Sequence, residues 1–215
     1  MSTQQHCVIN IGRQFGSGGR LIGEKLAHQL SFSFYDKELI NIASKESGLE
    51  KEFFEEADEK KRFGLFGGFL GLRSNPLGDE FLYNYLSNET LFKIQSDVIR
   101  GLATKHSAVF VGRCADYILR DHPRCVNIFI TADHEDRINR VMERQELPRE
   151  KVADLLAKTD KKRAGYYNYY TNKLWGVAES YDLCVNSSLL GIDETVNFIS
   201  KFAKEKFGSD QCRDQ

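Results

Sequence analysis

The chain has 215 residues, of which 41% are hydrophobic, and this is enough to bury one sizeable core, so we expect a single domain, 1–215. The 30 Lys and Arg residues nearly balance the 31 Asp and Glu residues, which argues against a nucleic-acid-binding protein because such proteins need an excess of cations. No apolar run approaches the roughly 18 residues of a membrane span and the first residues lack a signal-peptide pattern, so we expect a cytoplasmic protein with no membrane contact.

Five cysteines are spread along the chain without a pairing pattern: Cys7, Cys114, Cys125, Cys184 and Cys212. Their odd number and the absence of a CxxC pair argue against a disulfide framework and against a zinc site. We therefore expect the cysteines to be buried thiols in a reducing compartment. The histidines are scattered along the chain, so we expect no metal site made by protein side chains.

Short apolar runs alternate with longer amphipathic segments, which is typical of strand–helix units around a parallel sheet. The expected strands are residues 7–12, 31–35, 108–112, 126–131 and 181–186. Asp36 is the expected N-cap of a helix, and further helices are expected to begin at Asp133 and Pro148. The sequence therefore predicts an α/β domain with a five-stranded parallel sheet.

A glycine-rich turn, GRQFGSGGR at residues 12–20, follows the first expected strand and leads into a helix. The strict phosphate-loop pattern is GxxxxGK followed by Ser or Thr. Aligned by its glycines, this turn has Arg13 in place of the first glycine, Gly19 in place of the lysine and Arg20 in place of the Ser or Thr. The lysine that normally binds the phosphates is therefore missing.

The backbone of this turn still has the features of a phosphate site. Gly16, Ser17, Gly18 and Gly19 can direct successive N–H groups inward, and the positive end of the following helix dipole points to the same place. Either Arg20 or Arg13 could supply the cation that normally comes from the lysine. The alternative is a glycine-rich turn required only by steric fit.

Residues 63–78, FGLFGGFLGLRSNPLG, interrupt the alternating pattern with glycines, a proline and large apolar side chains. We interpret this segment as a mobile loop that closes over a ligand or makes a homo-oligomer contact, the alternative being an ordinary insertion packed on the core. A long amphipathic helix is expected over residues 79–106.

Four stretches resemble the cytidylate kinase family, in the order in which that family has them. FVGRCADYILRDHPRCVNIFITADHEDRINRVMERQ (residues 110–145) resembles the region in which a strand ends in a Gly-Arg pair and a later acidic, arginine-rich helix leads to the lid. SFYDKELI (33–40) resembles the start of the monophosphate-binding region, KTDKKRAGYYNYYTNKLWG (158–176) the lid, and YDLCVNSSLLGIDETVNFI (181–199) the final strand and helix. The loop GSGGR is similar to that of a divergent branch of the family, and the resemblance covers nearly the whole chain.

The resemblance implies a three-layer P-loop nucleoside monophosphate kinase fold with a helical monophosphate-binding insertion and a helical lid. The core would comprise residues 1–35, 107–144 and 177–215, the insertion 36–106 and the lid 145–176. The implied reaction is phosphoryl transfer from ATP to a nucleoside monophosphate, with CMP or dCMP as the first candidate.

Phosphoryl transfer requires mainly positioning and positive charge, so arginines are the expected catalytic residues. The residues expected to bind the ATP phosphates are Arg13, Gly16, Ser17, Gly18, Gly19 and Arg20. Arg163 would close on the site with the lid, and Arg137 and Arg144, on one helix face, would reach the site from the lid base. We therefore expect catalytic roles for Arg20, Arg137, Arg144 and Arg163, each of which could instead be a surface residue.

The expected acceptor-binding residues are Tyr35, Asp36, Arg113, Asp160 and Arg163. Arg113 follows a strand and a glycine, and so lies at the carboxyl edge of the sheet, where α/β proteins bind ligands. Tyr35 and Asp36 leave the second strand at the same edge, although Asp36 could also be a helix cap only.

Two questions about the chemistry stay open at this stage. Mg²⁺ is expected with ATP, but the Ser or Thr that usually binds it is absent, so Ser17 or the phosphates and waters alone would hold the ion. Without the lysine, the chain could instead be a catalytically weak nucleotide-binding sensor, or a kinase of another small acceptor.

Overall fold

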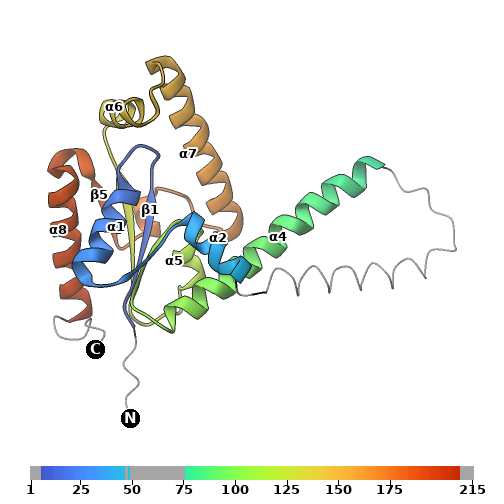
Figure 1. The fold of residues 1–215 in the computed structure, drawn as a ribbon, viewed down its shortest axis with the longest axis horizontal. Helices are drawn as coiled ribbons and strands as arrows, with labels where there is room; N and C mark the ends of the chain where they lie inside the picture. Colours follow the sequence, from blue (N-terminus) through green and yellow to red (C-terminus); the bar gives the residue numbers. More distant parts are fainter. Residues whose placement is uncertain (1–5, 47, 49–75, 209–215) are drawn as a thin grey trace, which may run out of the picture. The chain divides into compact units, whose positions relative to one another are not determined.

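The computed structural model describes residues 6–46, 48 and 76–208, which form an α/β fold with a five-stranded parallel sheet (Figure 1). The strands are β1 (Val8–Arg13), β2 (Ser33–Tyr35), β3 (Ala108–Val111), β4 (Cys125–Thr131) and β5 (Leu183–Asn186). The helices are α1 (Gly19–Leu30), α2 (Lys37–Glu46), α4 (Pro76–Ala103), α5 (Ala115–Ile118), α6 (His134–Gln145), α7 (Arg149–Thr171) and α8 (Ser187–Phe207), with a 3-10 turn η1 (Ala178–Ser180). The predicted α/β class and the five parallel strands are confirmed.

The described residues group into two compact units. The first contains the chain up to Lys37 and from Arg100 onward, and the second contains Glu38–Ile99. The second unit lies within the expected insertion 36–106, although the assignment of insertion, core and lid remains a prediction. All the sheet belongs to the first unit.

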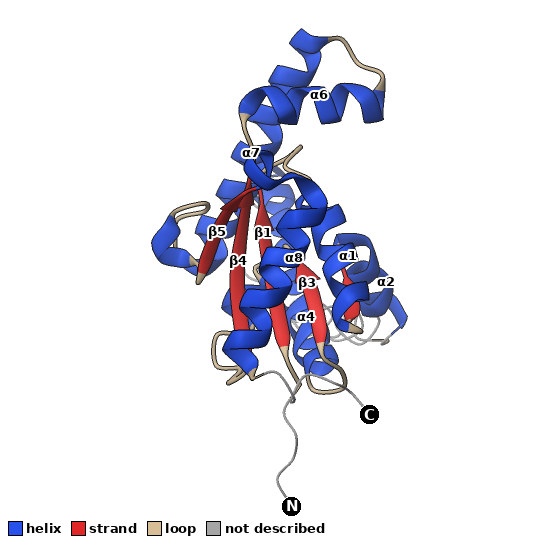
Figure 2. Cartoon of the chain, turned by 90° about the vertical axis from the view of Figure 1, so that its left-hand side faces the viewer, coloured by secondary structure: helices blue, strands red, loops and turns tan. Residues whose placement is uncertain are grey.

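The strand order across the sheet is β2-β3-β1-β4-β5, with every neighbouring pair parallel. Figure 2 shows β5, β4, β1 and β3 in this order behind α8 and α1. The register pairs Ile11 with Val111 and Arg13 with Ile130, so the carboxyl ends of the central strands come level at one edge. The loops that follow these strands therefore meet at that edge, as expected for a ligand site in an α/β fold.

Helices α1 and α8 cover one face of the sheet and bury the main hydrophobic core. Alternate strand residues such as Ile9, Ile11 and Ile128 point to this face and pack with Leu26 and Ile199 of the two helices. Because successive side chains of a strand point to opposite faces, the residues between them face the other side. The near-continuous burial of β1 and β3 follows from helices covering both faces.

The opposite face of the sheet carries polar and aromatic side chains and lies on the side of α5 and α7 (Figure 1). Asn10 of β1 donates from Nδ2 to the Asn127 Oδ1 at 2.9 Å. The Phe129 ring packs against Trp175 and Tyr181, with centroids 5.1 Å and 4.9 Å away. A cavity forms on this face, lined by Asn10, Trp175 and Tyr181 among others.

Several expected element ends differ from the observed ones by a few residues. β2 begins at Ser33 because Ser31, with φ 57°, ends α1 in a left-handed conformation. β3 ends at Val111 because Gly112 has φ 83°. Helix α4 begins at Pro76, inside the segment expected to be a loop, while residues 63–75 of that segment lie outside the described residues. The expected oligomer contact through this segment therefore stays a prediction.

Within the second unit, Gln95 of α4 donates from Nε2 to Asn41 Oδ1 of α2 at 2.9 Å. Ile40 of α2 and Ile94 of α4 are fully or almost fully buried. Among the helices that the structure describes, none has the length and apolar character to cross a membrane.

Candidate active site

The loop between β1 and α1 has the backbone geometry of an anion site. Gly16 and Gly18 have φ values of 80° and 77°, and the N–H of Ile22 donates to Gly18 O to begin the helix. Within the described part of the chain, the N–H groups of Gly16 and Gly18 donate to no protein atom. A Cβ at Gly16 would lie 2.8 Å from Arg137 O, so glycine is required both by conformation and by space. Main-chain donors without partners at a helix N-terminus suit a phosphate group.

Ser17 is buried and its hydroxyl takes part in the turn itself. Its Oγ donates to Gln14 O at 2.9 Å and accepts from the Gly19 N–H at 3.4 Å. The Ser187 hydroxyl, at the start of α8, donates to Ser17 O at 2.7 Å. Ser17 is thus a poor candidate for a Mg²⁺ ligand, and no group of three or more His, Cys, Asp or Glu side chains suited to a metal occurs among residues 6–46, 48 and 76–208.

Phe15 is a residue of the loop that both helix α7 and helix α6 contact. Its N–H donates to Asp160 Oδ1 at 2.8 Å, and its carbonyl accepts from Arg137 Nε at 2.7 Å. Arg137 also forms an ion pair with the second oxygen of Asp160. Both carboxylate oxygens of Asp160 are therefore engaged, and its expected acceptor-binding role stays a prediction.

Two further guanidinium groups lie over the Phe15 ring. The Cζ atoms of Arg144 and Arg163 are 5.3 Å and 5.4 Å from its centroid, and Arg163 Nη1 donates to Arg13 O at 2.9 Å. Burial lowers the pKa of Arg163, Asp160 raises it, and the nearby charges of Arg137 and Arg144 lower it further. Three arginines and one carboxylate leave an excess of positive charge beside the loop, which an anionic ligand would offset.

A cavity of about 300 Å³ lies beside this cluster, between the carboxyl ends of β1 and β3, helix α5 and helix α7. Cationic side chains line it: Arg13, Lys37, Arg113, Lys162 and Arg163. Aromatic side chains line it as well: Tyr166, Tyr167, Trp175 and Tyr181. Of the described residues that line it, Asp116 alone carries a carboxylate. This balance of charge favours an anionic small molecule.

Arg113 lies in a backbone segment in which three successive residues are left-handed. Gly112, Arg113 and Cys114 have φ values of 83°, 60° and 54°. Such conformations are costly for residues other than glycine and persist where the surrounding structure requires them, often at functional sites. The Arg113 guanidinium lies 5.5 Å from the centroid of the Tyr166 ring, and its buried Nε has no hydrogen-bond partner among the described residues.

Asp116 lies in the same cavity and was not expected from the sequence. Its carboxylate accepts a 2.6 Å hydrogen bond from the Tyr167 hydroxyl, and burial raises its pKa. The side chain is buried, and in the described ranges neither it nor Arg113 has an ion-pair partner. The cavity thus holds a buried carboxylate and a guanidinium that do not neutralise each other.

Arg20 and Asp36 form a separate pair on the side of β2. Arg20 Nε donates to Asp36 Oδ2 at 2.7 Å, and Arg20 Nη1 donates to Glu24 at 3.0 Å. Asp36 is buried, whereas Arg20 is exposed. Tyr35 stacks on Phe110 with centroids 5.3 Å apart and is not among the cavity residues. Arg20, Asp36 and Tyr35 therefore stay predicted site residues that the cavity does not include.

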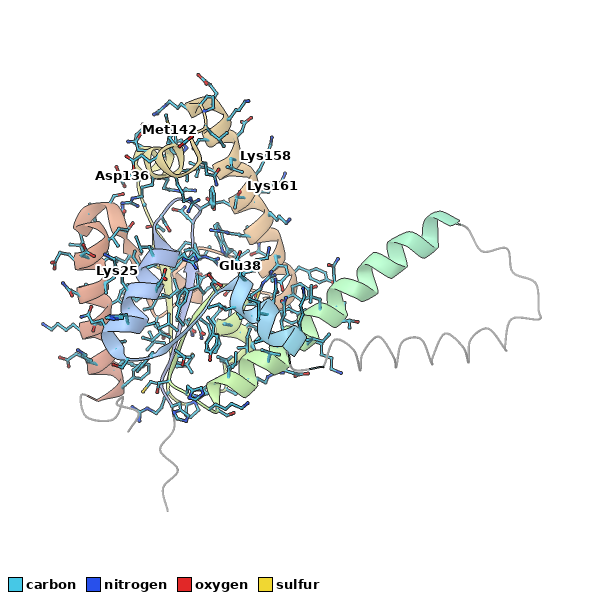
Figure 3. The ribbon with its side chains drawn as sticks, viewed as in Figure 1. Lys25, Glu38, Asp136, Met142, Lys158 and Lys161 are labelled. Atoms are coloured by element: carbon cyan, nitrogen blue, oxygen red, sulfur yellow. The ribbon has the colours of Figure 1, made fainter. Side chains whose placement is uncertain are left out.

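The structure gathers the other expected site residues around the phosphate loop. Arg137, Arg144, Asp160 and Arg163 surround Phe15, and Arg13 and Arg113 line the adjoining cavity together with Arg163. Figure 3 shows Lys158 and Lys161, which are exposed, on the outer side of α7. The spacing of Asp160 and Arg163 on a helix already predicted a shared face, but no sequence signal pointed to Phe15 or Asp116.

Comparisons with known proteins identify a family and structures of similar fold. A model described as the cytidylate kinase-like family matches residues 8–189. The crystal structure of an uncharacterized protein from Eubacterium ventriosum has a TM-score of 0.70 and 28% identity, over 93% of this chain and 99% of that one. Shikimate kinase from Bacteroides thetaiotaomicron has a TM-score of 0.48 and 12% identity over 93% of this chain and 97% of its own. No curated protein sequence matches the chain.

Proposed function

The chain belongs to the cytidylate kinase-like family, which supports a phosphotransferase, and from this we propose that it transfers the γ-phosphoryl group of ATP to a nucleoside monophosphate. CMP and dCMP are the first candidate acceptors. In this reaction an acceptor phosphate oxygen attacks the γ-phosphorus, the bond to the β–γ bridging oxygen breaks, and ADP leaves with that electron pair.

One observation carries the proposal: main-chain donors and a cationic cavity meet at one edge of the sheet. The unpartnered N–H groups of Gly16 and Gly18, within the described chain, suit the phosphates of a donor. The described residues that line the adjoining cavity include five cationic side chains and a single carboxylate, and so favour a second anion. Two anion sites side by side are what phosphoryl transfer between two phosphate compounds requires.

The cavity also favours an acceptor that is anionic at one end and donates a hydrogen bond at the other. Arg113 would hold the acceptor phosphate, and the Asp116 carboxylate would accept from a donor group elsewhere on the molecule. The exocyclic amine of cytosine is such a donor, whereas the corresponding uracil oxygen is an acceptor and would be repelled. This supports CMP over UMP.

Mg²⁺ fits the site as an ion held by phosphates and waters, a common arrangement for this cation. It would neutralise charge on the donor phosphates. The backbone of the β1–α1 loop would bind the phosphates of ATP. Arg163 and Arg113 would stabilise the negative charge on the transferred phosphoryl group and on the acceptor phosphate. The half-buried positions of both arginines would keep their guanidiniums oriented.

The test is ADP formation by the purified chain with Mg²⁺-ATP and a panel of ribo- and deoxyribonucleoside monophosphates. We expect turnover with CMP or dCMP, and we expect Arg163→Ala to lower kcat by about 10²-fold, as for loss of one charge-stabilising donor. Lys161→Ala, at an exposed position two residues away on α7, is the matched control and should keep the wild-type rate. Absence of turnover with every nucleoside monophosphate would refute the proposal.

A second candidate is a sensor that binds nucleotide without transferring phosphate. Two observations favour it. Gly19, at the lysine position of the pattern, has no side chain, and Arg20, at the next position, is paired with Asp36 and Glu24. Neither position therefore directs a cation toward a bound phosphate. A sensor would bind Mg²⁺-ATP in a calorimetric titration yet form no ADP with any acceptor. Slow turnover on non-nucleotide acceptors only would instead indicate a kinase of another small molecule.

A further inference from the structure

Two of the three departures from the phosphate-loop pattern, Arg13 and Gly19, are in contact in the folded chain. A Cβ added at Gly19 would lie 2.6 Å from Arg13 Cβ and 3.0 Å from Arg13 Cγ. The stem of Arg13 therefore occupies the space that the first atoms of a lysine at position 19 would need. The first of these contacts involves an atom attached directly to the backbone, so a lysine could enter only if the end of β1 moved.

The Arg13 side chain runs from this point to the entrance of the cavity. Its Nη1 would lie 2.1 Å from a Cβ at Gly112, so the guanidinium rests against the backbone after β3, beside Arg113. Arg13 is half-buried and lines the cavity, and Arg163 donates to its carbonyl oxygen. The guanidinium thus lies between the glycine loop and the acceptor cavity.

Arg20, the other cation near the loop, is in a different environment. Its guanidinium donates to the buried Asp36 and to Glu24 and lies 5.6 Å from the centroid of the Phe34 ring. To reach a phosphate at the loop it would have to leave a buried carboxylate, and this carries a desolvation penalty. The Arg13 guanidinium, in contrast, lies on the cavity wall, where a bound phosphate would contact it.

We infer that Arg13 and Gly19 are a reciprocal exchange, in which the phosphate-binding cation has moved from the end of the loop to its start. Arg13 then supplies the charge that a lysine supplies in the strict pattern, and Gly19 is the residue that leaves room for it. This inference rests on the proposed function for its catalytic readout. As a planar group with several donors, the guanidinium can contact donor and acceptor phosphate oxygens at the same time.

The test is a four-member cycle: the wild type, Arg13→Gly, Gly19→Lys and the double variant, which has both the first glycine and the lysine of the pattern and keeps Arg20 at the Ser or Thr position. In the double variant the nearest remaining neighbour of the new Cβ is Ile130 Cβ at 3.4 Å, an ordinary contact. Each protein is assayed for urea unfolding, for Mg²⁺-ATP affinity by calorimetry, and for kcat with the best acceptor. Lys25→Ala, at an exposed position on α1, is the matched loss of a cation (Figure 3).

We expect Arg13→Gly to lower kcat by about 10²-fold, the loss typical of one charge-stabilising donor, and to weaken ATP binding. Gly19→Lys should be the least stable member because of the clash with the Arg13 stem. The double variant should be more stable than Gly19→Lys and should recover kcat to within about tenfold of the wild type, since the two changes share one space and one role. Lys25→Ala should match the wild type.

Strictly additive effects in the cycle, or near-normal kcat and ATP affinity in Arg13→Gly, would overturn the inference. A large loss in Arg20→Ala without a loss in Arg13→Gly would do the same, and would assign the cation to α1. If the wild type turns over no acceptor, the proposed function fails. The non-additivity of the Arg13→Gly and Gly19→Lys effects on ATP affinity and on the free energy of unfolding then still tests whether the two residues compensate for each other.

Discussion

Replacing Asp160 by asparagine removes the counter-ion of a guanidinium that is almost fully buried. The side chains of Arg137 and Asp160 are 8% and 18% exposed, and their ion pair holds both main-chain groups of Phe15. Removing one partner of a buried pair typically costs about 3–5 kcal/mol because the other charge is left uncompensated. The asparagine side chain keeps an oxygen for the Phe15 N–H, so we expect a loss near the lower end, about 3 kcal/mol.

In a chain of this length, a loss of that size corresponds to a fall in Tm of about 6–12 °C. The β1–α1 loop, which the ion pair holds through Phe15, should also be less well oriented. We therefore expect Mg²⁺-ATP to bind about tenfold more weakly, equivalent to about 1.4 kcal/mol of binding free energy. Urea unfolding followed by circular dichroism measures the first effect and calorimetric titration the second. Asp154→Asn, an exposed position on the same helix, is the control and should change stability by less than about 0.5 kcal/mol.

A double-mutant cycle separates the pair from other effects of the substitution. Arg137→Met removes the charge that Asp160→Asn leaves unpaired, so the double variant should be less destabilised than the sum of the two single losses by about 0.5–3 kcal/mol. Equal unfolding free energies for Asp160→Asn and Asp154→Asn, or an additive cycle, would show that the pair does not hold the loop.

Three further expectations follow from single contacts. Gly112→Ala places a Cβ 2.1 Å from Arg13 Nη1 on a residue with φ 83°. We therefore expect the free energy of unfolding to fall by at least about 1–2 kcal/mol and acceptor binding to weaken. Gly101→Ala, whose Cβ would meet nothing within 4 Å, is the control and should not destabilise the protein. Arg20→Ala removes a charge-assisted hydrogen bond to the buried Asp36 and should lower the unfolding free energy by about 1.5–3 kcal/mol; unchanged unfolding would show the contact to be neutral. Burial raises the pKa of Asp116, so the preference for CMP over UMP should be present above that pKa and lost as the pH falls through it, which the ratio of kcat/KM values across a pH series measures.

The elements of this fold could be predicted because their signals are local. Apolar runs such as Val8–Arg13 and Ala108–Val111 specify buried strands, and Pro148 and Asp133 precede helices as expected. Asp133, however, does not cap α6 with its side chain: its Oδ1 accepts from Asn186 at the end of β5. The strand order was beyond local reasoning, since it depends on which faces pack together.

The site was predictable in its residue types and much less in their partners. The glycine turn and the arginines of α6 and α7 were expected near one another, and they are. Their organisation around Phe15 was not expected, because an aromatic side chain in a glycine loop has no pattern that separates it from a packing residue. The same holds for Asp116, whose importance depends on the Tyr167 hydroxyl from another helix.

By itself, the sequence determined the α/β class, the position of the glycine-rich turn between the first strand and helix, and the absence of the usual lysine, since each depends on neighbouring residues and on strand or helix periodicity. Only the tertiary structure decided how that absence is accommodated. Phe15 and Asp160 are 145 residues apart in the chain, and Arg13 meets Gly19 and Gly112 only when β1, α1 and β3 pack together. Steric and electrostatic contacts between residues that are distant in sequence form only on tertiary packing, and a local sequence pattern does not specify them.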